Sequence, residues 1–77
     1  MEITVLLFGQ AAELVASKQL TLTSVIDTNT AVSQLKSTYP QLASINFSVA
    51  LNTKLLNENT TLNNGDVLAI LPPFSGG

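Results

Sequence analysis

Near its end the chain reads Asn63-Asn64-Gly65-Asp66-Val67-Leu68-Ala69-Ile70-Leu71, a polar turn followed by five consecutive apolar residues. Asn-Gly and Gly-Asp pairs are typical of tight turns, and an unbroken apolar run of this length is typical of a strand covered on both faces. At the other end of the chain, residues 2–8 (EITVLLF) alternate at first and then become apolar on both faces. Because such strands usually lie in the middle of a sheet, we expect the first and last strands to be central and to pair in parallel.

The segments between these two strands predict two helices. Residues 10–16 (QAAELVA) are mostly good helix formers and predict one or two turns. Residues 31–39 (AVSQLKSTY) predict the main helix, because the polar stretch 27–30 offers N-cap chemistry before it and Pro40 stops it. The face expected to pack on the core carries positions i, i+3 and i+7 of this helix, which are Val32, Leu35 and Tyr39.

Three further segments predict strands: residues 20–26, residues 47–52 and a short edge segment at 53–56. The resulting order of strands around one long helix predicts an α+β fold, with one mixed β-sheet packed on one main helix, which is the β-grasp arrangement. A chain of 77 residues holds a single core. We therefore expect residues 1–71 to form the β-grasp domain and residues 72–77 to leave it as an extended C-terminal tail.

The ionisable residues argue against several classes of protein. Lys18, Lys36 and Lys54 are the only basic residues and the formal net charge is −2, so we expect no nucleic-acid binding. The chain has no Cys and no His, so it lacks disulfides, thiolate nucleophiles and the usual metal ligands, and we expect no metal site and no bound cofactor. Five scattered carboxylates and three lysines make an independent enzyme a poor hypothesis.

The hydropathy and charge content predict a cytoplasmic protein that binds a partner. No apolar run approaches the roughly 18 residues of a membrane span, and residues 1–4 lack the basic start of a secretory signal. Charged residues make up only 10% of the chain, against about 25% in typical soluble domains. Because interface cores are depleted in charge, we expect a largely apolar interface.

The last six residues, Pro72-Pro73-Phe74-Ser75-Gly76-Gly77, predict the part of the molecule that carries chemistry. Two prolines favour a stiff extended form, and two glycines can thread a passage too narrow for other residues. The terminal carboxyl, with an ordinary pKa of about 3.5, is ionised at neutral pH and resists nucleophiles. It becomes an acyl donor only after activation by an ATP-using partner, since this chain has no phosphate-binding loop. The alternative is an ordinary frayed terminus.

Several segments together resemble one family over essentially the whole chain. They are residues 5–10 (VLLFGQ) with Glu13 and Leu14, Val32 and Leu35 in the helix, residues 49–52 (VALN), and residues 62–77 (LNNGDVLAILPPFSGG). The last run is the most specific, because it joins a Gly-Asp turn, an apolar strand, Pro-Pro, one apolar residue, Ser and a terminal Gly-Gly. This pattern resembles the MoaD-like small, sulfur-carrying subunits of molybdopterin synthase, a branch of the ubiquitin-like sulfur carriers.

The resemblance implies a non-catalytic carrier subunit of an enzyme complex, with the ubiquitin-like β-grasp fold. A ubiquitin-activating-like adenylyltransferase, using ATP and Mg, would convert the Gly77 carboxylate to an acyl-adenylate, and a sulfur donor enzyme would replace AMP to give a thiocarboxylate. The tail would then enter the large subunit of a heterotetrameric molybdopterin synthase, where its sulfur passes to a pyranopterin precursor in molybdenum cofactor biosynthesis. The tail residues that would bind this partner are Pro72, Pro73, Phe74, Ser75 and Gly76.

Other functions stay open at this point. A ubiquitin-like carrier of this kind could serve tRNA thiolation or thiamin synthesis, or act as a protein modifier, although the Pro-Pro-x-Ser-Gly-Gly ending argues against the thiamin carriers. A non-catalytic β-grasp adaptor would instead bind a partner through its sheet and never have its terminus modified.

Three positions depart from the family pattern, which usually has Arg at Ala12, an acidic residue at Asn64 and a charged residue at Val67. The missing charges bear on docking to the activating enzyme and leave the tail intact. We expect Asp66 to be a turn former rather than a docking charge. We expect Phe74 to anchor the tail in a pocket of the partner.

Overall fold

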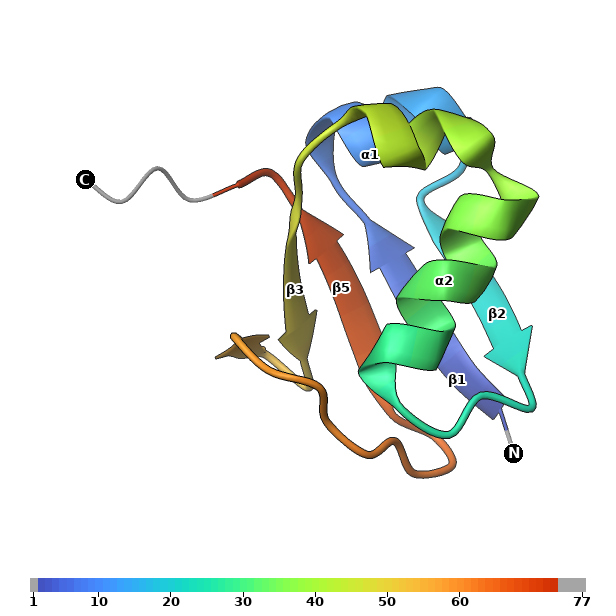
Figure 1. The fold of residues 1–77 in the computed structure, drawn as a ribbon, viewed down its shortest axis with the longest axis vertical. Helices are drawn as coiled ribbons and strands as arrows, with labels where there is room; N and C mark the ends of the chain where they lie inside the picture. Colours follow the sequence, from blue (N-terminus) through green and yellow to red (C-terminus); the bar gives the residue numbers. More distant parts are fainter. Residues whose placement is uncertain (1, 74–77) are drawn as a thin grey trace.

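The computed structural model describes residues 2–73, and Figure 1 shows one sheet with a helix laid across it and shorter helices at its end. The elements are β1 (Glu2–Leu7), α1 (Gly9–Val15), β2 (Gln19–Thr23), α2 (Thr28–Thr38), the 3-10 helix η1 (Pro40–Ser44), β3 (Ser48–Leu51), β4 (Lys54–Leu56) and β5 (Val67–Leu71). The strands form a mixed five-stranded sheet in the order β2-β1-β5-β3-β4. The predicted α+β class and ubiquitin-like β-grasp architecture are confirmed.

The two terminal strands occupy the centre of the sheet, as their apolar sequences predicted. β1 and β5 run parallel, with Thr4 opposite Val67 and Leu7 opposite Ile70, whereas the other neighbouring pairs are antiparallel. β5 therefore has a paired neighbour on each side up to Ile70, and its last residue, Leu71, pairs with Ser48 of β3. The tail starts from the most constrained strand of the sheet.

One face of the sheet packs against α2 and the short helices to form the core (Figure 1). Alternate residues of each central strand point into it, so that Val5, Leu68 and Ile70 are completely buried. Tyr39 packs against the core, as predicted. The buried cluster comprises Ile3, Val5, Leu7, Ala11, Leu22, Val25, Ala31, Leu35, Leu42, Leu62, Leu68 and Ile70.

The main helix begins earlier than predicted, at Thr28 rather than Ala31. Asp27 is its N-cap, because Asp27 Oδ1 accepts a hydrogen bond from Thr30 N at 2.8 Å. The predicted C-terminus is confirmed, since the helix ends before Pro40, which opens η1. The polar stretch that we interpreted as lying before the helix is its first turn.

The predicted set of core-facing residues of α2 was partly wrong. Leu35 is buried as expected, but Ala31 and Thr28 share its stripe, and Val32 is only half-buried. These three buried positions are spaced i, i+3 and i+7, so the period was correct and the choice of stripe was not. Small residues at the first two positions let the helix approach the sheet closely.

The second strand is shorter than the predicted 20–26 and ends at Thr23. Ser24 takes a left-handed conformation with φ +61°, which breaks the extended path. The next residue, Val25, is completely buried and belongs to the core cluster. An apolar residue in a connection can thus be mistaken for a continuation of the strand.

A polar clasp ties the loop after β4 to the start of α2. Asn59 Oδ1 accepts hydrogen bonds from Thr28 Oγ1 at 3.1 Å and from Asn29 N at 2.8 Å, and Asn59 Nδ2 donates to Asp27 Oδ2 at 3.2 Å. Hydrogen bonds from Thr30, and then from Asn59, lower the pKa of Asp27 below its ordinary value. The clasp closes the end of the core that lies farthest from the tail.

Candidate functional site

The root of the tail is held by β1. Pro72 and Pro73 follow β5 directly and both are exposed. Just before them, Phe8 N donates a hydrogen bond to Ile70 O at 3.0 Å, which extends the parallel pairing by one residue. Gly9 has φ +58°, and a Cβ on it would lie 2.9 Å from Pro72 Cγ. A residue without a side chain is therefore needed where Pro72 crosses the end of β1.

The other predicted tail residues, Phe74, Ser75, Gly76 and Gly77, lie outside the described residues, so their roles stay predictions. The described part shows the base from which they extend. Four extended residues beyond Pro73 span at most about 13 Å. A partner that acts on the Gly77 carboxylate must therefore contact the surface immediately around the tail root.

One face of the sheet is open within residues 2–73. α2 crosses the other face, and no described helix crosses this one (Figure 1). A row of four apolar residues runs straight across it in register, because Leu6 pairs with Ala69, Ala69 with Ala50, and Ala50 with Leu55. We call the apolar residues on this side the open sheet face; they are Leu6, Ala50, Leu55, Val67, Ala69 and Leu71.

The open sheet face corrects an expectation. The double-sided apolar runs predicted central strands covered on both faces, and the structure covers them on one, leaving Leu6 and Ala69 half-buried and Leu55 53% exposed. The physical reason is that the chain has one main helix, which can cover only one side of a sheet. Of this face, sequence reasoning singled out only Val67, as a position without an expected charge, although two-sided runs beside a single long helix were a signal for the whole face.

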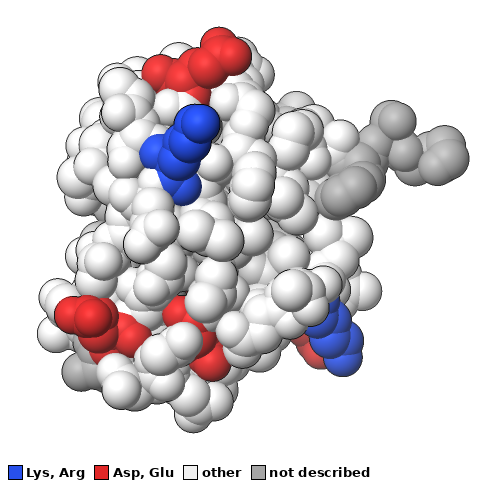
Figure 2. All heavy atoms as spheres, turned by 180° about the vertical axis from the view of Figure 1, so that it is seen from behind, with Lys and Arg blue, Asp and Glu red and all other residues white. Residues whose placement is uncertain are grey.

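Charged side chains avoid the middle of this face. Figure 2 views the molecule from behind Figure 1, and the blue and red residues gather toward the top and bottom with a broad uncharged area between them. The open sheet face, whose six residues are all apolar, is thus the candidate for the expected apolar interface. An uncharged surface of this kind is suited to a protein partner.

Two hollows flank the tail root, and Phe8, which is 45% exposed, lines both of them. The smaller, of about 50 Å³, lies among α1, the segment just before β3 and the two prolines. The larger, of about 390 Å³, lies between the end of β1, α1 and the start of β2. We call the larger one the Lys18 hollow; it is lined by Leu6, Leu7, Phe8, Gly9, Ala12, Lys18 and Gln19.

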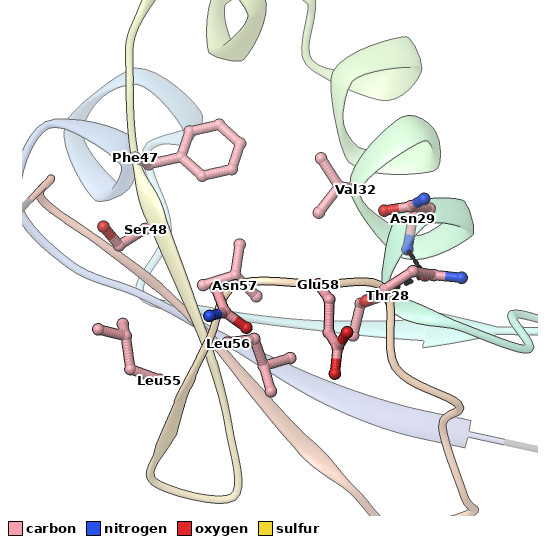
Figure 3. A pocket seen from close by; sticks show the side chains of 11 residues that line it. Thr28, Asn29, Val32, Phe47, Ser48, Leu55, Leu56, Asn57 and Glu58 are labelled. Carbon is pink, nitrogen blue, oxygen red and sulfur yellow. Dashed lines mark hydrogen bonds between the residues drawn. The ribbon is translucent and has the colours of Figure 1, made fainter.

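A third hollow, of about 360 Å³, lies between α2 and the β3–β4 hairpin (Figure 3). Phe47 and Val32 point toward each other across it, and Glu58 comes from the loop on its far side. Lys36 Nζ lies 5.5 Å from the centroid of the Phe47 ring, a cation–π distance. The polar clasp borders one end of this hollow, which is a gap between helix and hairpin, and Phe47 also lines the smaller hollow at the tail root.

Asp66 is the turn former that the sequence predicted. Its carboxylate accepts hydrogen bonds from Asn52 Nδ2 at 3.0 Å and Asn63 N at 2.7 Å, and Thr4 N donates to its carbonyl at 3.0 Å. The bond from Asn52, followed by that from Asn63, lowers the pKa of the Asp66 carboxyl. Its hydrogen-bonding capacity is used to join two connections of the sheet.

The three positions that lack the charges expected from the family pattern lie in different parts of the structure. Ala12 lines the Lys18 hollow, and Val67 lies on the open sheet face. Asn64 accepts a hydrogen bond from Glu2 N at 2.8 Å and so fastens the start of β1. Two of the three substitutions therefore make the surface near the tail and the sheet more apolar.

Metal and membrane features are not found in the described part of the chain. Within residues 2–73 no three His, Cys, Asp or Glu side chains gather in a way that could hold a metal ion. Within the same residues no helix combines the length and the apolar character needed to cross a bilayer.

Comparisons with known proteins identify the family. The profile of the ThiS family matches residues 5–77. The molybdopterin synthase sulfur carrier subunit of Arabidopsis thaliana is 37% identical over 81 residues, covering 100% of this chain and 84% of that protein.

Solved structures agree. The small archaeal modifier protein 1 of Methanosarcina acetivorans superimposes with a TM-score of 0.84 at 25% identity, over 99% of this chain and 96% of that one. A chain from the complex of subunits 1 and 2 of the molybdopterin-converting factor of Helicobacter pylori superimposes with a TM-score of 0.67 at 29% identity, over 100% of both chains. With its β-grasp sheet, its parallel terminal strands and a profile match reaching its last residue, this chain belongs to the ThiS family.

Proposed function

We propose that this chain is the sulfur-carrier subunit of molybdopterin synthase and that Gly77 carries the sulfur. The observation that carries the proposal is the 37% identity to the plant sulfur carrier subunit, which covers this chain completely, including Gly76 and Gly77. The chain also has the form that such a role requires, because its terminus extends from a central strand whose partners hold it on both sides.

The chemistry takes place at the terminal carboxyl in two steps. In the first, a carboxylate oxygen of Gly77 attacks the α-phosphorus of ATP bound with Mg in an adenylyltransferase, which forms the acyl-adenylate and releases pyrophosphate. In the second, the outer sulfur of a persulfide on a donor enzyme attacks the acyl carbon and displaces AMP, which forms an acyl disulfide. A thiol then cleaves the S–S bond, leaving the thiocarboxylate on Gly77 and a disulfide on the donor. Both catalysts are partners, since this chain has no Cys, no His and no phosphate-binding loop.

The partner that receives the sulfur is the large subunit of the synthase. The Helicobacter pylori relative is found in a complex of subunits 1 and 2 of the molybdopterin-converting factor. We place the corresponding subunit on the open sheet face, because that face is apolar, is uncharged in its middle (Figure 2) and ends at the tail root. From this position the tail reaches into the large subunit and delivers sulfur to a pyranopterin precursor. An apolar interface survives moderate salt, whereas a complex held by exposed ion pairs does not.

Intact-mass measurement tests the carrier chemistry. After co-expression with an adenylyltransferase and a sulfur donor, the purified chain gains the mass difference between one sulfur and one oxygen atom. A variant lacking Gly77 is the matched control and gains nothing. If the wild-type mass never changes and the variant still supports cofactor production, the carrier function is wrong.

A protein modifier is the second candidate, and the likeness to the small archaeal modifier protein 1 favours it. In that case the activated Gly77 acyl group forms an isopeptide bond with a lysine amine of a target protein. Because Lys54 is the last tryptic site of this chain, tryptic peptides of target proteins would carry residues 55–77 as a branch on a lysine. Such peptides, absent from a strain without Gly77, would establish this use. Carriers for tRNA thiolation share the activated terminus and would be separated by measuring tRNA thiolation in the deletion strain. An adaptor that acts through its sheet alone tolerates a tag fused after Gly77, whereas a carrier loses function.

A further inference from the structure

We propose that the Lys18 hollow is an anchor site for the large subunit. It would bind one apolar side chain of that subunit, next to which an Asp or Glu pairs with Lys18. This inference rests on the proposed function and deepens it by assigning the surface that fixes the partner beside the tail. Three features of the structure carry it: the walls of the hollow, its position, and the charge at its rim.

The walls are mostly apolar. Leu6, Phe8 and Ala12 face the hollow, and its volume of about 390 Å³ accommodates a large side chain of a partner. Phe8 is 45% exposed, a high value for an aromatic residue in a domain of this size. A concavity that can desolvate an inserted side chain is typical of the positions where interfaces concentrate their affinity.

The position links the hollow to both parts of the proposed interface. Leu6 belongs to the hollow and also to the apolar row across the open sheet face, so a partner on that face continues into the hollow without a break. Gly9 forms part of the wall and also lies under Pro72. Four extended residues beyond Pro73 span at most about 13 Å, so a protein that receives Gly77 lies near the tail root, which this hollow borders.

The charge at the rim specifies the partner further. Lys18 is exposed, and its backbone is fixed where its carbonyl accepts a hydrogen bond from Leu7 N at 2.9 Å. Its side chain makes no ion pair with any carboxylate of residues 2–73. A free ammonium beside an apolar hollow is complementary to an apolar side chain with a neighbouring Asp or Glu.

Two substitutions test the site, both at exposed positions whose side chains are not part of the buried core. Lys18→Glu reverses the charge at the rim. Gln19→Trp fills the hollow, because Gln19 pairs directly with Leu6 and a strand tolerates an aromatic residue there. The matched controls are Lys36→Glu on α2 and Thr23→Trp, which lies on the same strand and the same side but pairs with Glu2 at the other end of the sheet. Thermal unfolding of each variant confirms that it is folded.

The measurement is the Kd for the large subunit of the same organism, by calorimetry at low ionic strength. We expect each test variant to bind about 10-fold or more weakly and each control to stay within about 2-fold of wild type. The tests separate this inference from the proposed function. If wild type binds and the test variants bind equally well, the anchor site is wrong and the carrier function stands.

A second readout distinguishes the occupant. Intact mass measures the rate at which the adenylyltransferase and the sulfur donor convert each variant to its thiocarboxylate. If that rate falls while affinity for the large subunit is unchanged, the hollow serves the activating enzyme and the inference is overturned. If wild type neither binds the large subunit nor gains sulfur, the proposed function and the anchor site fail together.

Discussion

The two faces of the sheet are built from the same strands and differ in what covers them. On the α2 side, Val5, Leu68 and Ile70 are completely buried. On the other side, Leu6 and Ala69 are half-buried. Burial of an apolar side chain stabilises a fold by roughly 1.5–3 kcal/mol, so the first face supplies most of the folding free energy. The second face leaves apolar side chains partly exposed, and the charged residues lie toward the top and bottom of this side of the molecule (Figure 2).

The largest expected effect is on stability and belongs to the covered face. Leu68→Ala removes a completely buried side chain from the middle of β5 and is expected to lower the free energy of unfolding by about 3 kcal/mol. A domain of this size has only a few kcal/mol in total, so the variant is largely unfolded at 37 °C. Val67→Ala, the adjacent residue on the open face, is the control and should cost about 1 kcal/mol or less. Urea titration measures the free energy of unfolding of both variants. Equal losses of stability would contradict the difference between the two faces.

The next effect is on binding and belongs to the open face. Leu55→Asp places a charge on a side chain that is already 53% exposed, so its melting temperature should stay close to that of wild type. Its affinity for the large subunit should fall by about 10-fold or more, since a charge must be buried in an apolar interface. Ile26→Asp is the matched control, because Ile26 is 67% exposed and lies in the connection after β2, away from this face. Loss of binding in both variants would contradict a localised interface.

A smaller, stabilising effect is expected at the β3–β4 turn. Asn52 and Thr53 have φ of +48° and +73°, the left-handed values of a two-residue hairpin turn. A β-branched residue is strained in this conformation, so Thr53→Gly should raise the free energy of unfolding by about 1 kcal/mol. Thr21→Gly, in the extended backbone of β2, should lower it by about 1 kcal/mol. A destabilised Thr53→Gly variant would show that Thr53 makes a contribution beyond its backbone.

The smallest effect is a pH dependence at Asp66. Its pKa is lowered in the folded state, so the carboxylate stabilises the fold above its unfolded pKa of about 3.9, and this stabilisation is lost as the pH falls through the folded value. Asp66→Asn should therefore melt at a lower temperature than wild type at pH 7, because its amide cannot accept both hydrogen bonds. The difference should shrink at pH 2. Glu13→Gln, the same change on the exposed side of α1, is the control. A difference that is constant with pH would exclude this linkage.

Prediction from the sequence succeeded where the pattern was local and strong. The apolar runs of β1 and β5, the turn at Asp66 and the stop before Pro40 are each encoded by neighbouring residues. It failed at the start of α2 and at the end of β2, where polar and apolar residues in connections resemble the elements beside them. The tail chemistry stays a prediction, and it rests on a terminal Gly-Gly after two prolines, which is recognisable without any tertiary contact. The Lys18 hollow was not predicted, because its walls come from three separate elements.

The amino-acid order alone determined that two strands are apolar on both sides and that one long helix accompanies them, and it predicts that the last carboxyl is the reactive group. These properties are local, since each depends on residues within one turn or one strand. Only the tertiary structure decided which face α2 leaves bare, that Gly9 lies under Pro72, and that Lys18 stands beside an apolar hollow at the tail root. Such contacts join residues far apart in the chain, and no periodicity within a single segment encodes where a distant segment will pack.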